Sequence, residues 1–221
     1  MILAREDLEG AIDFSGGKVN TLVIENQDYF CELLSDINSQ INGFSGKFTL
    51  SENNKILAFP KNAELIDSIL NFQINQKSLI NKIITRLSEE SVDSENYRRT
   101  LEMLGDIQQY VETLSDSFPC ELIESKLSFE NIIKAVGVEI QADYKNKLEE
   151  IIDYMELVRE FDRDKLFIFV SLRSYFSPEK IADFFDTIIS HEFKVLLVDQ
   201  LSNEALPNEK RLTIDADLCE I

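Results

Sequence analysis

The chain has 221 residues, of which 44% are hydrophobic, so it can bury a real core and is not a disordered polypeptide. It carries 22 Lys and Arg against 41 Asp and Glu, a formal net charge of −19. This charge argues against non-specific adhesion to nucleic acid or anionic membrane, although it says nothing of local patches. No signal-peptide pattern or run of about 18 apolar residues occurs, and the three cysteines are widely spaced. We expect a cytoplasmic protein with no membrane-spanning segment.

The N-terminal part of the chain reads as short elements. A strand at 12–14, a glycine turn at 15–18 and a strand at 19–25 are followed by a helix over about 28–41. A hairpin is predicted from 47–50 and 55–59. The turn Ser15-Gly16-Gly17-Lys18 is not a phosphate loop, because its glycines precede a strand instead of opening a helix.

From about 62 to 161 the apolar residues recur at helical spacing. One stripe runs through Ile69, Phe72 and Leu79, another through Leu101, Leu104 and Val111, and a last one through Ile151 and Met155. The segment 137–141, GVEIQ, is a short strand or an extended connector. Such heptad-like stripes predict long helices that pack at shallow angles. A helix of about 24 residues would be about 36 Å long, so we expect some of these helices to project as an arm.

The segment 164–200 predicts strand, loop, helix and strand. The runs 167–170 and 195–198 are continuously apolar, which indicates parallel strands buried on both faces. Ser177 and Pro178 begin the helix between them. Residues 212–214 add a final strand. The fold class is therefore α/β, with a discontinuous head at 1–64 and 160–221 and a helical leg inserted at 65–159.

The loops of this core are unsuited to nucleotide chemistry. The loop after the strand at 167–170 has no glycine, and Asn26-Gln27-Asp28 has neither glycine nor lysine. His191, the single histidine, falls at the end of a helix, where the helix dipole favours it. We expect no ATP hydrolysis, no zinc site and no catalytic triad.

Acidic and basic residues both gather where the helical leg returns to the core. The acidic ones offer the oxygen ligands that calcium prefers, but no EF-hand loop is present, and a solvated acidic face is the alternative. The basic ones would face DNA only if several copies bring them to one surface. The acidic set is Glu121, Glu124, Glu130, Glu139 and Asp143, and the basic set is Lys126, Lys134, Lys145 and Lys147.

The segment order resembles that of a known family. The stretches FSGGKVNTLVIE, NIIKAVGVEI and DKLFIFVSLRSYFSPEKIADFF, with the later FKVLLVD, resemble the Csn2 family of type II-A CRISPR adaptation proteins. The resemblance covers nearly the whole chain. It implies an α/β head similar to a P-loop ATPase without a nucleotide site, together with a helical leg.

The resemblance also implies a function. It implies a homotetrameric ring, a dimer of dimers, whose lysine-lined hole encloses double-stranded DNA loaded from free ends. It implies bound Ca²⁺ that shapes the leg, and support of spacer acquisition with the CRISPR integrase subunits and the effector nuclease, without catalysis. Carried onto this chain, it favours Glu121, Glu124, Asn131 and Glu139 as calcium ligands, with Glu130 and Asp143 as neighbours. Lys134 is the best-matched lysine of the hole, ahead of Lys126, Lys145 and Lys147.

Charge sets a condition on this function. Four copies, each of −19, would carry −76 and repel DNA at low salt unless calcium neutralises acids or lysines segregate into the hole. Two alternatives stay open. One is a non-catalytic adaptor whose striped arm docks a partner helix. The other is a metal-dependent phosphoryl-transfer enzyme that uses the carboxylates.

Overall fold

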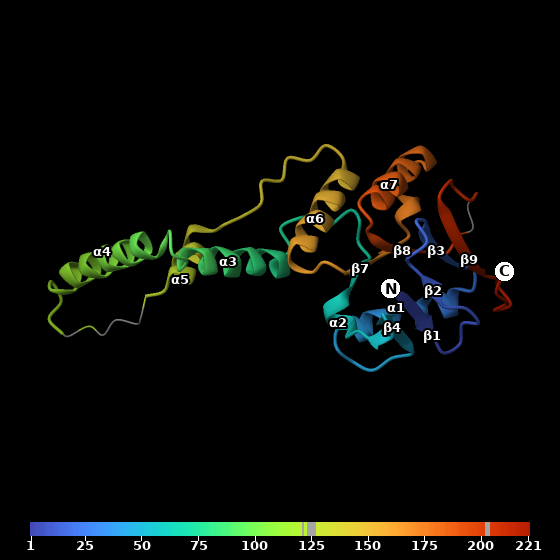
Figure 1. Ribbon diagram of the computed structural model, residues 1–221, viewed down its shortest axis with the longest axis horizontal. Coiled ribbons are helices and arrows are strands. Elements are labelled where there is room, and N and C mark those ends of the chain that lie inside the picture. The colour runs from blue at the N-terminus through green and yellow to red at the C-terminus, as the bar shows by residue number, and fades with distance from the viewer. Residues whose placement is uncertain (121, 123–126, 202–203) are drawn as a thin grey trace. The chain divides into compact units, whose positions relative to one another are not determined.

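The computed structural model describes residues 1–120, 122, 127–201 and 204–221, which form two compact units (Figure 1). The first, the α/β unit, comprises residues 1–72 and 146–221, and the second, the helical unit, comprises residues 73–145. The α/β unit is therefore built from two separated parts of the chain.

The centre of the α/β unit is a five-stranded sheet in which every neighbouring pair is parallel. The strand order is β6-β7-β8-β3-β9. Every residue of β3 and β7 is buried, as the unbroken apolar runs predict for strands covered on both faces. The predicted α/β fold class with a parallel sheet is confirmed. The strands are β3 Val19–Ile24, β6 Ala63–Ile66, β7 Leu166–Val170, β8 Lys194–Asp199 and β9 Glu209–Ile214.

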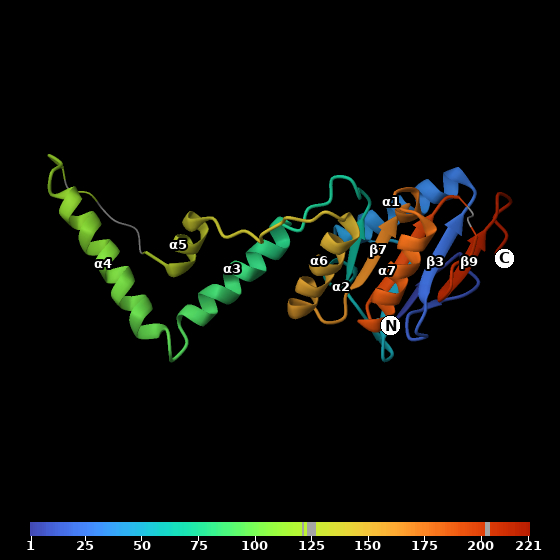
Figure 2. The ribbon, with the colours of Figure 1, turned by 90° about the horizontal axis from the view of Figure 1, so that it is seen from above.

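Helices cover both faces of this sheet (Figure 2). Helix α1 (Gln27–Ile41) packs Leu33 and Ile37 into the core formed with the even-numbered residues of β3 and β8. Helices α6 (Lys147–Phe161) and α7 (Pro178–Ser190) lie on the other side. Helix α7 begins at N-cap Ser177 with Pro178 in its first turn, as predicted, and a short 3-10 turn, η1 (Leu172–Ser174), precedes it.

A second, antiparallel sheet packs under α1. Its order is β2-β1-β4-β5, and the predicted hairpin is present as β4 and β5 with Asn53 and Asn54 at positive φ in the turn. The Ser15–Lys18 segment joins β2 to β3, which belong to different sheets. The strands are β1 Ile2–Arg5, β2 Ile12–Asp13, β4 Phe48–Glu52 and β5 Lys55–Ile56.

The helical prediction was wrong for the segment that follows this hairpin. A short helix α2 (Phe59–Asn62) leads directly into strand β6, and residues 67–76 form no helix or strand. Ile69 and Phe72 are 1% and 5% exposed in the core of the α/β unit. Their helical spacing therefore reflects two separate contacts with this core instead of one helical face. The preceding residues, 63–66, form a strand because they pair with β7.

The helical unit contains α3 (Lys77–Ser91), α4 (Tyr97–Ser115) and α5 (Phe129–Val136). Helices α3 and α5 lie side by side, whereas α4 extends away from both over most of its length (Figures 1 and 2). The longest, α4, has 19 residues, or about 28 Å, and is shorter than expected. Residues 138–141 form no strand, so the extended connector is the correct alternative. No helix among the described residues is long and apolar enough to cross a membrane.

Candidate nucleic-acid and metal-binding site

The predicted site residues fall on three consecutive pieces of the chain. Glu121, Glu124 and Lys126 lie outside the residues that the structure describes. Helix α5 carries Glu130, Asn131 and Lys134, the connector carries Glu139, Asp143 and Lys145, and Lys147 is the first residue of α6.

Helix α5 is short because both of its ends are specified by sequence. The Ser128 side chain accepts a hydrogen bond from the backbone N–H of Asn131, and Gly137 ends the helix at φ 76°. Within the helix, the exposed side chains of Glu130 and Lys134 form an ion pair one turn apart. Such surface pairs contribute about 0.3–0.5 kcal/mol, so Lys134 can leave Glu130 for another anion at little cost.

A side-chain clamp holds the connector after α5. The Asn75 amide donates to the carbonyl oxygen of Ile140 at 2.9 Å and accepts from the Ile140 backbone N–H at 2.8 Å. Both bonds lie within the helical unit, and they pair the connector as a strand neighbour would. The adjacent Glu139 is exposed. Nothing in the local sequence around Asn75 signals this contact, because its partner lies 65 residues later.

Lys147 differs from Lys134 because its ammonium group bonds a main-chain carbonyl oxygen as well as a buried carboxylate. It donates to the carbonyl oxygen of Phe72 at 2.8 Å and to Glu150 Oε2 at 2.7 Å, and its side chain is 32% exposed. Glu150 is buried, so this pair holds the start of α6 against residue 72. Lys134 and Lys145, in contrast, are exposed.

In the described part of the chain, the side chains of the types that bind metal ions lie apart from one another. No three His, Cys, Asp or Glu side chains gather there in a way that could hold a metal ion. Glu139 and Asp143 are exposed on the connector, while Glu130 faces Lys134. Carboxylates with this exposure can contribute single oxygen ligands, whereas calcium takes six to eight.

The helical unit also has an apolar groove of about 500 Å³. It lies between the end of α3, the start of α4 and one face of α5. Its walls include Leu87, Met103, Phe129 and Ile132, with Arg99 among the polar residues that line it. The groove can accept aliphatic or aromatic side chains.

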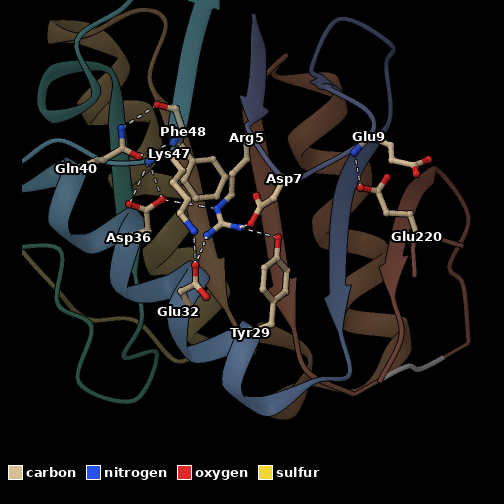
Figure 3. A network of polar contacts seen from close by, with 10 residues as sticks. All are labelled: Arg5, Asp7, Glu9, Tyr29, Glu32, Asp36, Gln40, Lys47, Phe48 and Glu220. Carbon is tan, nitrogen blue, oxygen red and sulfur yellow. Dashed lines mark hydrogen bonds and ion pairs between the residues drawn. The ribbon is translucent and has the colours of Figure 1, made fainter. Parts of the chain in front are cut away.

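A polar network fixes α1 to the antiparallel sheet of the α/β unit (Figure 3). The buried guanidinium of Arg5 contacts Asp7, the Tyr29 hydroxyl and Glu32, and it lies over the rings of Tyr29 and Phe48. Burial is the largest single influence and lowers the pKa of Arg5, but Tyr29 and the nearby carboxylates together have a greater effect, so the pKa is raised. This arrangement is a structural joint whose cation is inaccessible to a ligand.

A second charged network lies on the sheet face beside α7. Arg173 Nε is 3.2 Å from Asp199 Oδ2, and Arg173 Nη2 is 2.7 Å from Glu209 Oε1. Burial raises the pKa of Asp199 to about 6, because the contact with Arg173 offsets only part of the desolvation. For Glu209, hydrogen bonds from Arg211 and Arg173 outweigh burial, and its pKa is lowered. Arg173 neutralises Asp199, so the end of β8 presents no free carboxylate.

The carboxyl end of β3, where a related nucleotide-binding protein would hold phosphate, is occupied by the chain itself. The Asn26 side chain accepts from the Tyr29 backbone N–H at 3.0 Å and donates to the carbonyl oxygen of Ala216 at 3.1 Å. Asp28 adds a carboxylate to the first turn of α1. A negative group at this helix terminus opposes phosphate binding.

Comparison with known proteins agrees with this architecture. The family model described as "CRISPR-associated protein (Cas_Csn2)" matches residues 40–218, which places the chain among the CRISPR-associated adaptation proteins. A curated relative, the CRISPR-associated protein Csn2 of Enterococcus faecalis, is 20% identical over 142 residues. The match covers 64% of this chain and 65% of the relative's length. The chain belongs to the Csn2 family, and the resemblance seen in the sequence is confirmed.

Proposed function

We propose that the chain is a non-catalytic, calcium-dependent binder of double-stranded DNA ends. It acts as a homotetrameric ring in the cytoplasm and supports spacer acquisition with the CRISPR integrase subunits and the effector nuclease. The observation that carries this proposal is the family match across residues 40–218. The occupied carboxyl end of β3 supports a role without nucleotide.

The proposed DNA contacts are to phosphates. Lys134 and Lys145 are exposed in the helical unit, where they can meet a polyanion directly. Lys126 is retained as a weaker candidate, and Lys147 would first have to release Phe72 and Glu150. Contacts of this kind carry no sequence information and weaken steeply with salt.

The proposed role of calcium is to complete a site that single copies leave dispersed. The exposed carboxylates of the connector would gain ligands from a neighbouring segment or copy. Neutralising them also lowers the repulsion between DNA and a chain of net charge −19. The proposed ligands are Glu121, Glu124, Glu130, Asn131, Glu139 and Asp143.

The central test compares linear and closed circular duplex DNA of equal length in a gel shift. With calcium, the linear duplex is expected to shift and the circle to stay free, because an intact ring loads from ends. A chelator should abolish the shift. Equal binding of both forms, or binding indifferent to chelator, would contradict end loading or calcium dependence respectively.

A matched pair of lysine variants tests the contact surface. Lys134→Ala is expected to weaken DNA binding several-fold and to lower its salt dependence, because a phosphate contact is lost. Lys180→Ala, at an exposed position on α7 in the α/β unit, is the control and should bind as the unmodified chain does. Unchanged affinity of Lys134→Ala would remove this lysine from the contact surface.

A second candidate function is a protein adaptor without DNA binding. The exposed apolar side chains of α4 favour it, since Tyr97, Leu101 and Leu114 are 49–52% exposed. If the chain is an adaptor, calcium should not promote DNA binding, but the chain should still bind the integrase subunits or the nuclease in a pull-down assay. Loss of that binding on Leu101→Asp would identify α4 as the docking element.

A further inference from the structure

Strand β9 is the last strand in the order of the five-stranded sheet, so one of its edges faces away from that sheet. Its inner edge bonds to the β3 side through even-numbered residues, since the carbonyl oxygen of Ile214 accepts from the backbone N–H of Glu25. Backbone groups alternate in direction along a strand, so the odd-numbered residues of β9 point their N–H and C=O groups outward. A row of outward-pointing backbone groups is a template for pairing with another chain.

The chain itself satisfies this outer edge in two places. Before the strand, a turn allows the backbone N–H of Glu209 to donate to the carbonyl oxygen of Leu206 at 3.3 Å. After the strand, the segment 215–221, the edge cap, turns and runs back along β9. Thr213 and Ile221 exchange both of their backbone hydrogen bonds, at 3.2 Å and 2.8 Å, as directly opposed residues of an antiparallel pair do.

The edge cap is fixed by its own turn and by a contact with the N-terminal segment. The Asp215 carboxylate accepts from the backbone N–H of Cys219 at 2.8 Å, which shapes the turn. The Glu220 carboxylate accepts from the backbone N–H of Glu9 at 2.6 Å (Figure 3). Leu218 has φ 65°, a left-handed conformation that is uncommon for leucine and persists only where surrounding contacts determine it. The position of the cap is therefore specified.

The edge cap covers the half of β9 that carries no charge. The first half includes Lys210 and Arg211, and charged side chains on an edge strand oppose pairing with another chain. The second half consists of Leu212, Thr213 and Ile214, which are uncharged, and the last two are β-branched residues that favour strands. The returning stretch of the cap is short and carries a carboxylate, so it offers a poorer edge than the one it covers.

Without the cap, this edge of β9 complements a second copy of itself. A second β9 that runs antiparallel, with Thr213 opposite Thr213, would take the two hydrogen bonds that Ile221 now makes. The same register places Arg211 opposite Asp215 of the second copy on both sides of the axis, in addition to the ion pair of Arg211 with Glu209. Opposite charges in directly opposed positions favour this register.

We propose that the edge cap prevents strand pairing between the β9 edges of two copies of this chain. The cap belongs to the same chain as the edge, so its effective concentration at the edge exceeds that of a second copy in solution. It therefore occupies the pairing positions and leaves association to other surfaces. The proposal concerns the α/β unit alone, and it depends neither on DNA, nor on calcium, nor on the assembly proposed above.

A chain that lacks residues 219–221, compared with the full chain by sedimentation in chelator without DNA, tests the cap. Its weight-average mass is expected to rise roughly twofold above that of the full chain, because each copy gains one edge for pairing. Adding Thr213→Pro to the shortened chain is expected to restore the mass of the full chain. Proline removes the N–H that points outward at this position, whereas the bonds to β3 use the other edge.

Thr213→Val in the shortened chain is the matched control, because it keeps the outward N–H and should leave the raised mass unchanged. Equal masses of the shortened and the full chain would overturn the proposal. A raised mass that Thr213→Pro does not reverse would also overturn it, since aggregation of a misfolded chain does not depend on one outward N–H. Reversal by Thr213→Val would assign the effect to the side chain and would contradict pairing through the backbone.

Discussion

The α/β unit and the helical unit differ in how they use apolar residues. Among the described residues, 36 of the 40 buried apolar side chains belong to the α/β unit and four to the helical unit, Ile74, Leu79, Ile84 and Ile133. Conversely, ten of the 18 large exposed apolar side chains belong to the helical unit. The α/β unit therefore buries most of its large apolar side chains, whereas the helical unit leaves many of its own exposed.

The polar residues show the same contrast. In the α/β unit, Arg5 and Arg173 are buried and each contacts two or more carboxylates. In the helical unit, the ion pairs of Arg86, Arg98 and Lys134 are exposed and join residues one helical turn apart. Buried pairs specify one arrangement, while exposed pairs exchange partners at little cost. The α/β unit is therefore fixed by buried charged contacts, whereas the ion pairs of the helical unit constrain it little.

The largest expected effect is a core truncation in the α/β unit. Phe169 is fully buried in β7 and packs edge-on against Phe184 at 5.8 Å. Phe169→Ala should lower the free energy of unfolding by about 3–5 kcal/mol. Leu114→Ala on α4 should cost a dilute single copy less than about 1 kcal/mol, since that side chain is 51% exposed. If urea titrations showed that both variants lose a similar free energy of unfolding, the two units would not differ in how they depend on buried apolar side chains.

The next effect concerns pH. The pKa of Asp199 is about 6 in the folded chain and 3.8 in its ordinary state, so the folded chain holds this proton more tightly. The resulting stabilisation is present below about pH 4 and is lost as pH rises through 6, a change of roughly 3 kcal/mol. Asp199→Asn should remove this part of the pH dependence of urea unfolding. A variant whose unfolding keeps the same slope between pH 4 and 6 would contradict the assignment.

A smaller effect is expected at Gly46, before β4. A Cβ there would lie 2.2 Å from Asp36 Oδ1 and 2.5 Å from Gln40 Cγ. Both side chains bond to the start of β4, through the backbone N–H groups of Lys47 and Phe48. Gly46→Ala should therefore cost about 1–3 kcal/mol in thermal or urea unfolding. Gly16→Ala, where nothing lies within 4 Å of the added Cβ, is the control and should change little.

The smallest expected effect is at Gly105 in α4. Gly105→Ala adds helix propensity worth about 1 kcal/mol and meets no neighbour within one chain. Helicity of a dilute single copy should rise slightly by circular dichroism. A variant whose helicity is unchanged or lower would contradict this expectation.

Prediction from sequence succeeded where an element's pattern is local. The unbroken apolar runs at 167–170 and 195–198 indicated parallel strands, and Ser128 and Gly137 marked both ends of α5. It failed at residues 63–72, where Ile69 and Phe72 mimic a helical stripe. Their burial comes from the core of the α/β unit, which a window of neighbouring residues does not contain.

For the candidate site, sequence identified the type and order of the charged residues but not their partners. Exposure of Lys134 and the internal bonds of Lys147 distinguish two lysines that look equivalent along the chain. The clamp from Asn75 to Ile140 joins positions 65 residues apart. Such contacts depend on which segments fold side by side, and no local pattern encodes that.

By itself, the sequence determined the α/β class, the parallel strands and the family, because periodicity, caps and motif order are properties of neighbouring residues. Only the tertiary structure decided that Arg173 neutralises Asp199, that the chain occupies the carboxyl end of β3, and that α4 is left uncovered. Burial and pairing across the fold set these features, since the free energy of a charge or an apolar face depends on what surrounds it.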